Sequence, residues 1–178
     1  LYICRAIKIK IMKKINILKA IVDLLWIFSM PVVLIIIGVS FTTFFVDLSD
    51  LNIELDTINI NQNDLFSKIL FVISSLNYLL LIVALYFFRK VLTNFVRVRV
   101  FEEVVISSFK KIGNLLTFSG FISLIISIIG KIYFEQKVSL EFGLNQHLVL
   151  ICLGLFFLVL SEIFKIAKNA KQENDLTI

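Results

Sequence analysis

Four long apolar runs, separated by short polar segments, dominate the pattern of this 178-residue chain. The runs begin near Ile21, Ile69, Ile112 and His147, and each continues for about the twenty residues that a helix needs to cross a bilayer core. They predict four transmembrane helices, at about 21–46, 68–88, 112–133 and 147–167. We therefore expect a mainly α, integral membrane protein built as a four-transmembrane-helix bundle.

The basic residues are distributed unevenly around these runs. Most Lys and Arg residues precede the first run, lie between the second and third, or follow the fourth. Four spans put both termini on one side, and the positive-inside rule assigns the basic side to the cytoplasm. The acidity of the first outer segment agrees with this orientation. Its acidic residues are Asp47, Asp50, Glu54, Asp56 and Asp64. We expect a multi-pass protein of the bacterial cytoplasmic (inner) membrane with both termini in the cytoplasm.

The composition leaves little room for a separate soluble domain. Apolar residues make up 59% of the chain, charged residues 17%, and the mean hydropathy is +0.98. We therefore expect one membrane domain over 12–178. Met12-Lys13-Lys14 is typical of a bacterial start, so residues 1–11 are interpreted as a misassigned extension. The net charge of +5 lies where the chain leaves the membrane, so it predicts contact with anionic lipid and no direct nucleic acid binding.

Two polar segments predict structure outside the lipid on the outer side. Residues 51–60, LNIELDTINI, alternate between apolar and polar on both sides of a plausible turn at Asp56-Thr57. Val138, Leu140 and Phe142 alternate in the second outer loop. We expect a small extracytoplasmic β cap of two or three strands that joins the two outer loops.

The connection over 89–111 is longer than two neighbouring spans require. Apolar residues recur in it at helical spacing, and charged residues lie between them: Val98, Phe101, Val105, Phe109 and Ile112 form the apolar stripe. This spacing predicts an amphipathic helix at the membrane surface or against a partner. The alternative is that the two adjoining span helices extend into the cytoplasm.

Small residues recur at spacings of three and four along the third run: Gly113, Thr117, Gly120, Ser123, Ser127 and Gly130. Helices in lipid associate closely through such faces. We expect this stripe to pack against another helix of the same chain, with a homo-oligomer as the alternative.

Polar residues inside the apolar runs are the natural candidates for function in a membrane protein. Asn77 lies near the middle of the second run and is expected to hydrogen-bond between helices. Asp23 and Glu162 lie at the inner ends of the first and fourth runs, where Lys19 and Lys165 are within helical pairing distance. A transporter would instead need such groups to face one water-filled cavity.

The familiar catalytic and metal-binding patterns are missing from the sequence. It has one histidine, His147, and two cysteines, Cys4 and Cys152, of which Cys152 is expected to be a small buried hydrophobe. There is no Gly-rich phosphate loop and no Gly-x-Ser-x-Gly motif. We therefore predict no enzyme activity, no catalytic residue, no metal and no cofactor.

Several segments of the chain resemble a bacterial four-span membrane family known as domain of unknown function 2975. The likeness runs from about Met12 and is most specific at the C-terminus; it is carried by ILFVISSLNYLLLIVALYFFRKVLTNF (69–95), Phe101-Glu102-Glu103, Phe109-Lys110-Lys111-Ile112-Gly113, Glu162-Ile163-Phe164 and Glu173-Asn174-Asp175-Leu176-Thr177-Ile178. The resemblance implies a multi-pass inner-membrane protein of unassigned function, and a small cytosolic helix-turn-helix regulator as partner.

These observations together favour a non-enzymatic regulatory or interaction protein. Its cytoplasmic loop and tail would bind a cytosolic partner, through Phe101, Phe109, Glu173, Asn174, Asp175, Leu176, Thr177 and Ile178. The alternative is a small transporter, channel subunit or immunity-type membrane protein, for which Asn77 would line a polar cavity.

Overall fold

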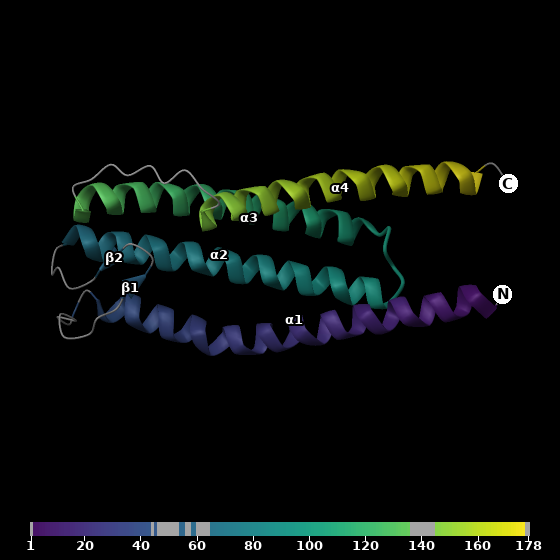
Figure 1. Cartoon of the computed structure of the whole chain (residues 1–178), viewed down its shortest axis with the longest axis horizontal. Helices are drawn as coiled ribbons and strands as arrows, with labels where there is room; N and C mark the ends of the chain where they lie inside the picture. The colour runs from purple at the N-terminus through teal and green to yellow at the C-terminus, as the bar shows by residue number, and fades with distance from the viewer. Residues whose placement is uncertain are drawn as a thin grey trace.

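The computed structural model consists mainly of four long helices (Figure 1). They are α1 (Tyr2–Thr42), α2 (Leu65–Val96), α3 (Glu103–Gly130), which continues as the π-helical turn η1 (Lys131–Glu135), and α4 (Gln146–Leu176). All four are long and apolar enough to cross a membrane, which confirms the prediction of a mainly α, multi-pass membrane protein.

The structure describes the backbone of 2–43, 45, 54–55, 58–59, 65–135 and 145–176, and the side chains of 12–43, 45, 65–133 and 145–174. The first residue of α1, the last residue of α4 and the α2–α3 connection lie at the same end of the molecule, as Figure 1 shows. We call this end the basic end, because Arg89, Lys90 and Arg97 near the end of α2 lie there.

The predicted separate surface helix over 89–111 is wrong, and the alternative of two extended span helices is what the structure contains. Helix α2 continues to Val96 and α3 begins at Glu103, so only six residues connect them. The reversal passes through Val98, whose φ of 61° is rare for a β-branched residue. Val105, Phe109 and Ile112 of the apolar stripe are therefore buried between helices, whereas Val98 and Phe101 are exposed.

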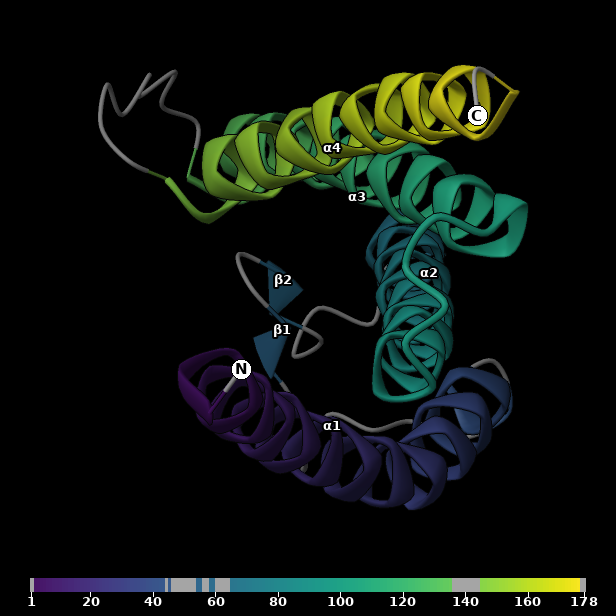
Figure 2. The same cartoon turned by 90° about the vertical axis from the view of Figure 1, so that its right-hand side faces the viewer.

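The four helices of the expected bundle are arranged as an open arc. The most extensive interface joins α3 and α4, followed by α2 with α3 and then α1 with α2, whereas α1 packs on neither α3 nor α4 to a comparable extent. Figure 2 shows α1 and α4 at opposite ends of this arc. The physical reason is that lipid chains are as apolar as the side chains they replace, so no hydrophobic force closes the arc.

Helix α1 is the least buried of the four helices. It is visibly bowed in Figures 1 and 2, and it contains Pro31, which removes a backbone hydrogen bond inside a helix. Most of its large apolar side chains are exposed, such as Ile27, Phe28 and Leu34. In a bilayer these side chains would face lipid.

The predicted β cap joining the two outer loops is not supported. Within 51–60, β1 (Glu54–Leu55) and β2 (Ile58–Asn59) pair antiparallel, with Glu54 opposite Asn59. Two residues per strand provide too few hydrogen bonds and too little apolar face for a stable cap. The other alternating segment, with Val138, Leu140 and Phe142, lies outside the described residues.

Helix α4 is displaced along its axis relative to α3. Its first residues lie beside Gly120, since an added Cβ there would lie 3.1 Å from the carbonyl oxygen of His147. From this level α3 continues for ten residues to Gly130, about 15 Å, or half the hydrocarbon thickness. At the basic end Lys168 pairs with Glu103, the first residue of α3. Helix α4 continues from there to Leu176, about 12 Å further. Figure 1 shows this end of α4 extending past the start of α3.

Candidate functional site

Close backbone contact between α3 and α4 fixes the position of α4. A Cβ at Gly113 would lie 2.9 Å from the carbonyl oxygen of Gly154, and a Cβ at Gly154 would lie 2.6 Å from the backbone nitrogen of Thr117. The predicted intramolecular packing of the small-residue stripe is therefore confirmed at Gly113, Thr117 and Gly120. Sequence reasoning missed Gly154, although it is the single glycine of the fourth apolar run.

A cluster of phenylalanine rings holds α2, α3 and α4 together near the basic end. The ring centroid of Phe109 lies 5.2 Å from that of Phe164, 5.9 Å from Phe157 and 6.1 Å from Phe95. Phe109 is only 4% exposed, so its predicted role as a partner contact is wrong: the ring is a core side chain. Phe101 lies at the rim, 41% exposed and 6.1 Å from Phe164, and stays accessible.

Two polar contacts join α3 to α4 beside this cluster. The Ser161 hydroxyl donates a hydrogen bond of 3.0 Å to the carbonyl oxygen of Ile106, and Lys168 pairs with Glu103. A buried hydroxyl bonded across helices fixes their register, because it has no water to bond instead. The projecting end of α4 is therefore attached to a rigid base.

The C-terminal tail is helical as far as Leu176. Helix α4 continues to Leu176, and the side chains of Glu173 and Asn174 are exposed on it. The side chains of Asp175 and Leu176 lie outside the part of the chain that is described, as do Thr177 and Ile178 entirely. Of the predicted tail contacts, the structure thus presents Glu173 and Asn174 on a helical surface.

The two acidic residues at the span ends differ in their partners. Glu162 is exposed and lies 4.0 Å from Lys165, which confirms the predicted helical pair. Asp23 does not pair with Lys19 as predicted; its Oδ1 accepts a hydrogen bond of 2.5 Å from Arg89 Nε on α2. The arginine lies 66 positions away in sequence, and only the packing of α1 on α2 brings the two together.

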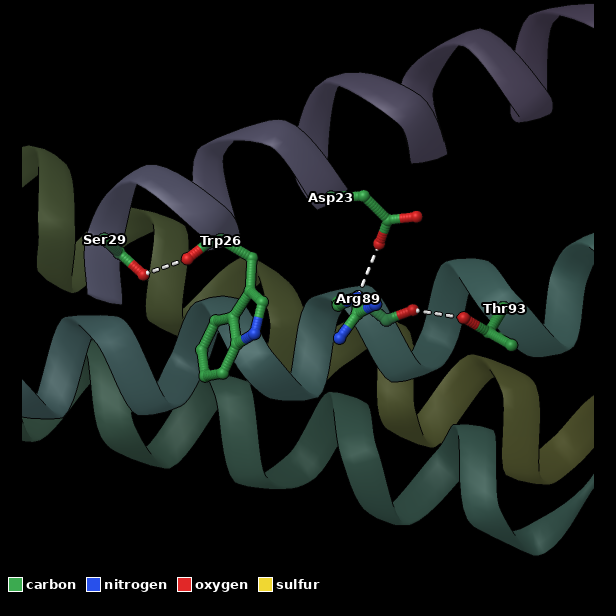
Figure 3. Close-up of polar contacts among 5 residues, drawn as sticks. All are labelled: Asp23, Trp26, Ser29, Arg89 and Thr93. Atoms are coloured by element: carbon green, nitrogen blue, oxygen red, sulfur yellow. Dashed lines mark hydrogen bonds and ion pairs between the residues drawn. The ribbon is translucent and has the colours of Figure 1, made fainter. Parts of the chain in front are cut away.

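Figure 3 shows this ion pair with its neighbours on α1 and α2. Trp26, on the turn after Asp23, packs its ring 5.4 Å from that of Tyr86, and Thr93 donates to the carbonyl oxygen of Arg89. Both side chains of the ion pair are partly exposed. The contact therefore links α1 to α2 near the basic end without burying a charge.

A shallow basic pocket of about 310 Å³ lies next to this ion pair. It is lined by Tyr86, Arg89, Lys90, Thr93, Asn94, Arg97 and Val104. Within the described residues, no acidic side chain pairs with Lys90 or Arg97. This positive surface suits an acidic partner or an anionic headgroup.

Asn77 is buried in the middle of the arc. It is 8% exposed, and its Nδ2 donates a hydrogen bond of 3.2 Å to the carbonyl oxygen of Ser119 on α3, which confirms the predicted interhelical bond. Its Oδ1 accepts no hydrogen bond from the part of the chain described. The amide is thus half satisfied, which is costly away from water.

Asn77 also lines a cavity of about 460 Å³ to which all four helices contribute. The other lining residues are Val32 and Ile36 of α1, Ser74, Ser75, Tyr78 and Leu81 of α2, Ser123 of α3, and Gln146 and Leu150 of α4. Asn77 and Ser74 share this cavity with Ser123, the one residue of the small-residue stripe that lines it, and much of the remaining wall is aliphatic. Asp23 and Glu162 are not part of it.

The remaining candidates are the metal-ligating residue types and Cys152. In the described ranges, no group of three or more His, Cys, Asp or Glu side chains could hold a metal ion. Cys152 is exposed on α4, so the expectation of a buried cysteine is wrong. The reason is that α4 packs on α3 through the face of Ile151, Gly154 and Leu158.

Comparison with known proteins gives one match. The model of a family described as "Protein of unknown function (DUF2975)" matches residues 24–178. No curated protein matches the chain, and neither does any solved structure. Function therefore has to be argued from the helices, the basic end and the cavity.

Proposed function

We propose that this chain, which belongs to the DUF2975 family of proteins of unknown function, is a non-enzymatic membrane interaction protein whose basic end binds a cytosolic partner. One observation carries the proposal. Helix α4 continues to Leu176, about 12 Å beyond the Lys168–Glu103 ion pair, so the family-like tail is helical as far as Leu176. A surface that is already ordered loses less entropy on binding.

The rest of the basic end supports the same role. The phenylalanine cluster around Phe109 and the bond from Ser161 to Ile106 hold the base of this helix. The pocket with Lys90 and Arg97 adds positive charge nearby. We expect a partner with an acidic patch, which would meet these cations. A small cytosolic helix-turn-helix regulator, implied by the family resemblance, is the first candidate to test.

A photo-crosslinking amino acid placed at Asn174 tests the proposal in cells that express the full chain. The matched control is the same amino acid at Val159, an exposed position in the apolar run of α4. We expect a cytosolic protein to be captured from position 174 and not from 159. Equal capture from both positions, or none from 174, would contradict the proposal.

The helical presentation of the tail is tested separately at Ala170. Ala170→Pro interrupts α4 beyond the ion pair, because proline removes a backbone donor and collides with the preceding turn. Ala170→Leu is the control, since leucine keeps the helix. We expect Ala170→Pro to abolish capture from position 174 and Ala170→Leu to preserve it. Unchanged capture from the proline variant would mean that the helix is not the contact.

The proposal also requires the basic end to lie in the cytoplasm. Cysteines introduced at Glu173 and Phe45, in a chain whose own cysteines are replaced by serine, report the orientation. A membrane-impermeant maleimide should label Phe45→Cys in spheroplasts and Glu173→Cys only after lysis. The reverse pattern would place the proposed surface on the wrong side.

The cavity favours a small transporter as the second candidate. Ser74, Asn77 and Ser123 line it together, near the middle of α2 and α3. A transporter must open this cavity to each side in turn, so Ser123→Cys should react with an impermeant maleimide from either side of a vesicle. Protection of this cysteine from both sides would exclude alternating access.

A further inference from the structure

The displacement of α4 places its N-terminus at the level of the middle of α3. The carbonyl group of His147, the second residue of α4, lies beside Gly120, and Asn77 bonds to Ser119 at the same level. These α3 residues are central in the apolar segment Glu103–Tyr133. A helix that begins inside the hydrocarbon layer presents unpaired N–H groups and the positive end of its dipole there.

Two backbone donors in the first turn of α4 have no acceptor within the helix. The backbone N–H of Val149 is bonded to the carbonyl oxygen of Asn145 at 3.1 Å. The N–H groups of Gln146 and Leu148 come earlier in the helix and have no intrahelical acceptor. Within the described residues the side-chain amide of Gln146 is also without a partner, and it lines the cavity.

Asn77 supplies an independent and complementary observation in the same cavity. It is more than nine-tenths buried, and its Oδ1 is an acceptor that receives no hydrogen bond from any described group. One cavity is thus lined by Gln146 of α4, which has unused donors, and by Asn77 of α2, which has an unused acceptor. Water is scarce at this depth, so leaving both unsatisfied would be unfavourable.

The cavity lining restricts the ligand that could satisfy them. Every lining residue is uncharged, and the walls beside the polar groups are aliphatic: Val32, Ile36, Leu81 and Leu150. Helices α1 and α4, which both contribute to the lining, do not pack extensively on each other. A ligand with an uncharged polar head and a hydrocarbon chain fits these walls, with its chain leaving between α1 and α4.

We infer that this cavity binds a single-chain lipid whose uncharged head both donates and accepts hydrogen bonds. The carboxylic acid of a fatty acid and the hydroxyl groups of a monoacylglycerol share this chemistry. The oxygen of the head accepts from the first turn of α4 and from Gln146, and its O–H donates to Asn77 Oδ1. This inference does not rest on partner binding at the basic end.

The test uses the full chain purified in dodecyl maltoside and a palmitic acid probe that carries a diazirine next to its carboxyl group. After irradiation, mass spectrometry locates the crosslinks, and unlabelled oleic acid and monoolein are added as separate competitors. We expect crosslinks within 74–81 and 146–150, suppressed by at least one competitor, which identifies the source of the head. Suppression by neither competitor would overturn the inference, as would crosslinks spread over lipid-facing residues such as Phe118 and Leu155.

Three leucine substitutions decide whether the polar groups bind the head. Asn77→Leu and Gln146→Leu should each weaken probe binding about tenfold, the factor expected for one lost hydrogen bond. Asn114→Leu is the matched control, because Asn114 is exposed on α3 and does not line this cavity, and its affinity should not change. Gln146 is exposed, so its variant tests the inference even if Asn77→Leu fails to fold. Wild-type affinity in Gln146→Leu would overturn the inference.

Discussion

Replacing Gly154 by alanine tests whether close approach at this glycine positions α4. An alanine Cβ would lie 2.6 Å from the backbone nitrogen of Thr117 and 2.9 Å from the carbonyl oxygen of Gly113. The first distance is 0.8 Å shorter than the 3.4 Å at which ordinary contact begins. Both obstacles are backbone atoms, so a side-chain rotation cannot relieve them, and α3 and α4 must move apart.

The expected magnitude follows from overpacking. Added methyl groups in a packed core cost about 1–3 kcal/mol of unfolding free energy, partly offset by about 0.5–1 kcal/mol from the better helix propensity of alanine. We expect Gly154→Ala to lower the unfolding free energy by about 1–2 kcal/mol. Separation of the helices should also lengthen the hydrogen bond from Ser161 to Ile106.

Gly38→Ala is the matched control for this substitution. Gly38 lies in α1, and a Cβ added there meets nothing within 4 Å. Only the propensity gain applies, so this variant should be unchanged or more stable by up to about 1 kcal/mol. The assay is unfolding in mixed micelles by titration with sodium dodecyl sulfate, followed by far-ultraviolet circular dichroism. A Gly154→Ala variant as stable as Gly38→Ala would refute the close approach of α3 and α4.

Two further predictions concern the basic end. Phe109→Ala should lower the unfolding free energy by about 3–5 kcal/mol, because the ring is buried in the phenylalanine cluster. In the same titration Phe118→Ala, at a 60% exposed position, should change the unfolding free energy by less than about 0.5 kcal/mol. Equal losses of unfolding free energy in Phe109→Ala and Phe118→Ala would contradict the assigned core. A double-mutant cycle of Asp23→Asn and Arg89→Gln should give a coupling of about 0.2–1 kcal/mol that decreases with added salt, because both side chains are partly exposed. A coupling of zero at low salt would mean that this ion pair does not hold α1 on α2.

Several parts of the site could be predicted from the sequence because the cause is local. An amide in the middle of an apolar run must find a partner, and Asn77 does so on α3. Glu162 and Lys165 lie one helical turn apart and pair accordingly. Glycines at spacings of three and four predicted the packing face around Gly113 and Gly120. In the last two cases the helix itself brings the relevant residues onto one face, whereas for Asn77 only the need for a partner was predictable and the packing of α2 on α3 supplies Ser119.

Other parts could not be predicted because they depend on which helices become neighbours. Arg89 competes with Lys19 for Asp23, and only the packing of α1 on α2 decides the outcome. Phe109 lies on an apolar stripe that could have faced a membrane, a partner or another helix; the sharp reversal at Val98 buries it. The spacing of the apolar residues would be the same whether the stripe faced a membrane, a partner or another helix.

The sequence by itself determined that four helices exist, where their apolar segments lie and that the chain belongs in a membrane, because transfer of each side chain into lipid contributes nearly independently along a helix. Tertiary structure decided the open arc, the displacement of α4 and the cavity shared by Asn77 and Gln146. Lipid solvates an unpaired helix face as well as a paired one, so hydropathy does not specify helix neighbours or their register. Those are decided by close contacts such as Gly154 against Thr117, which the hydropathy pattern does not record.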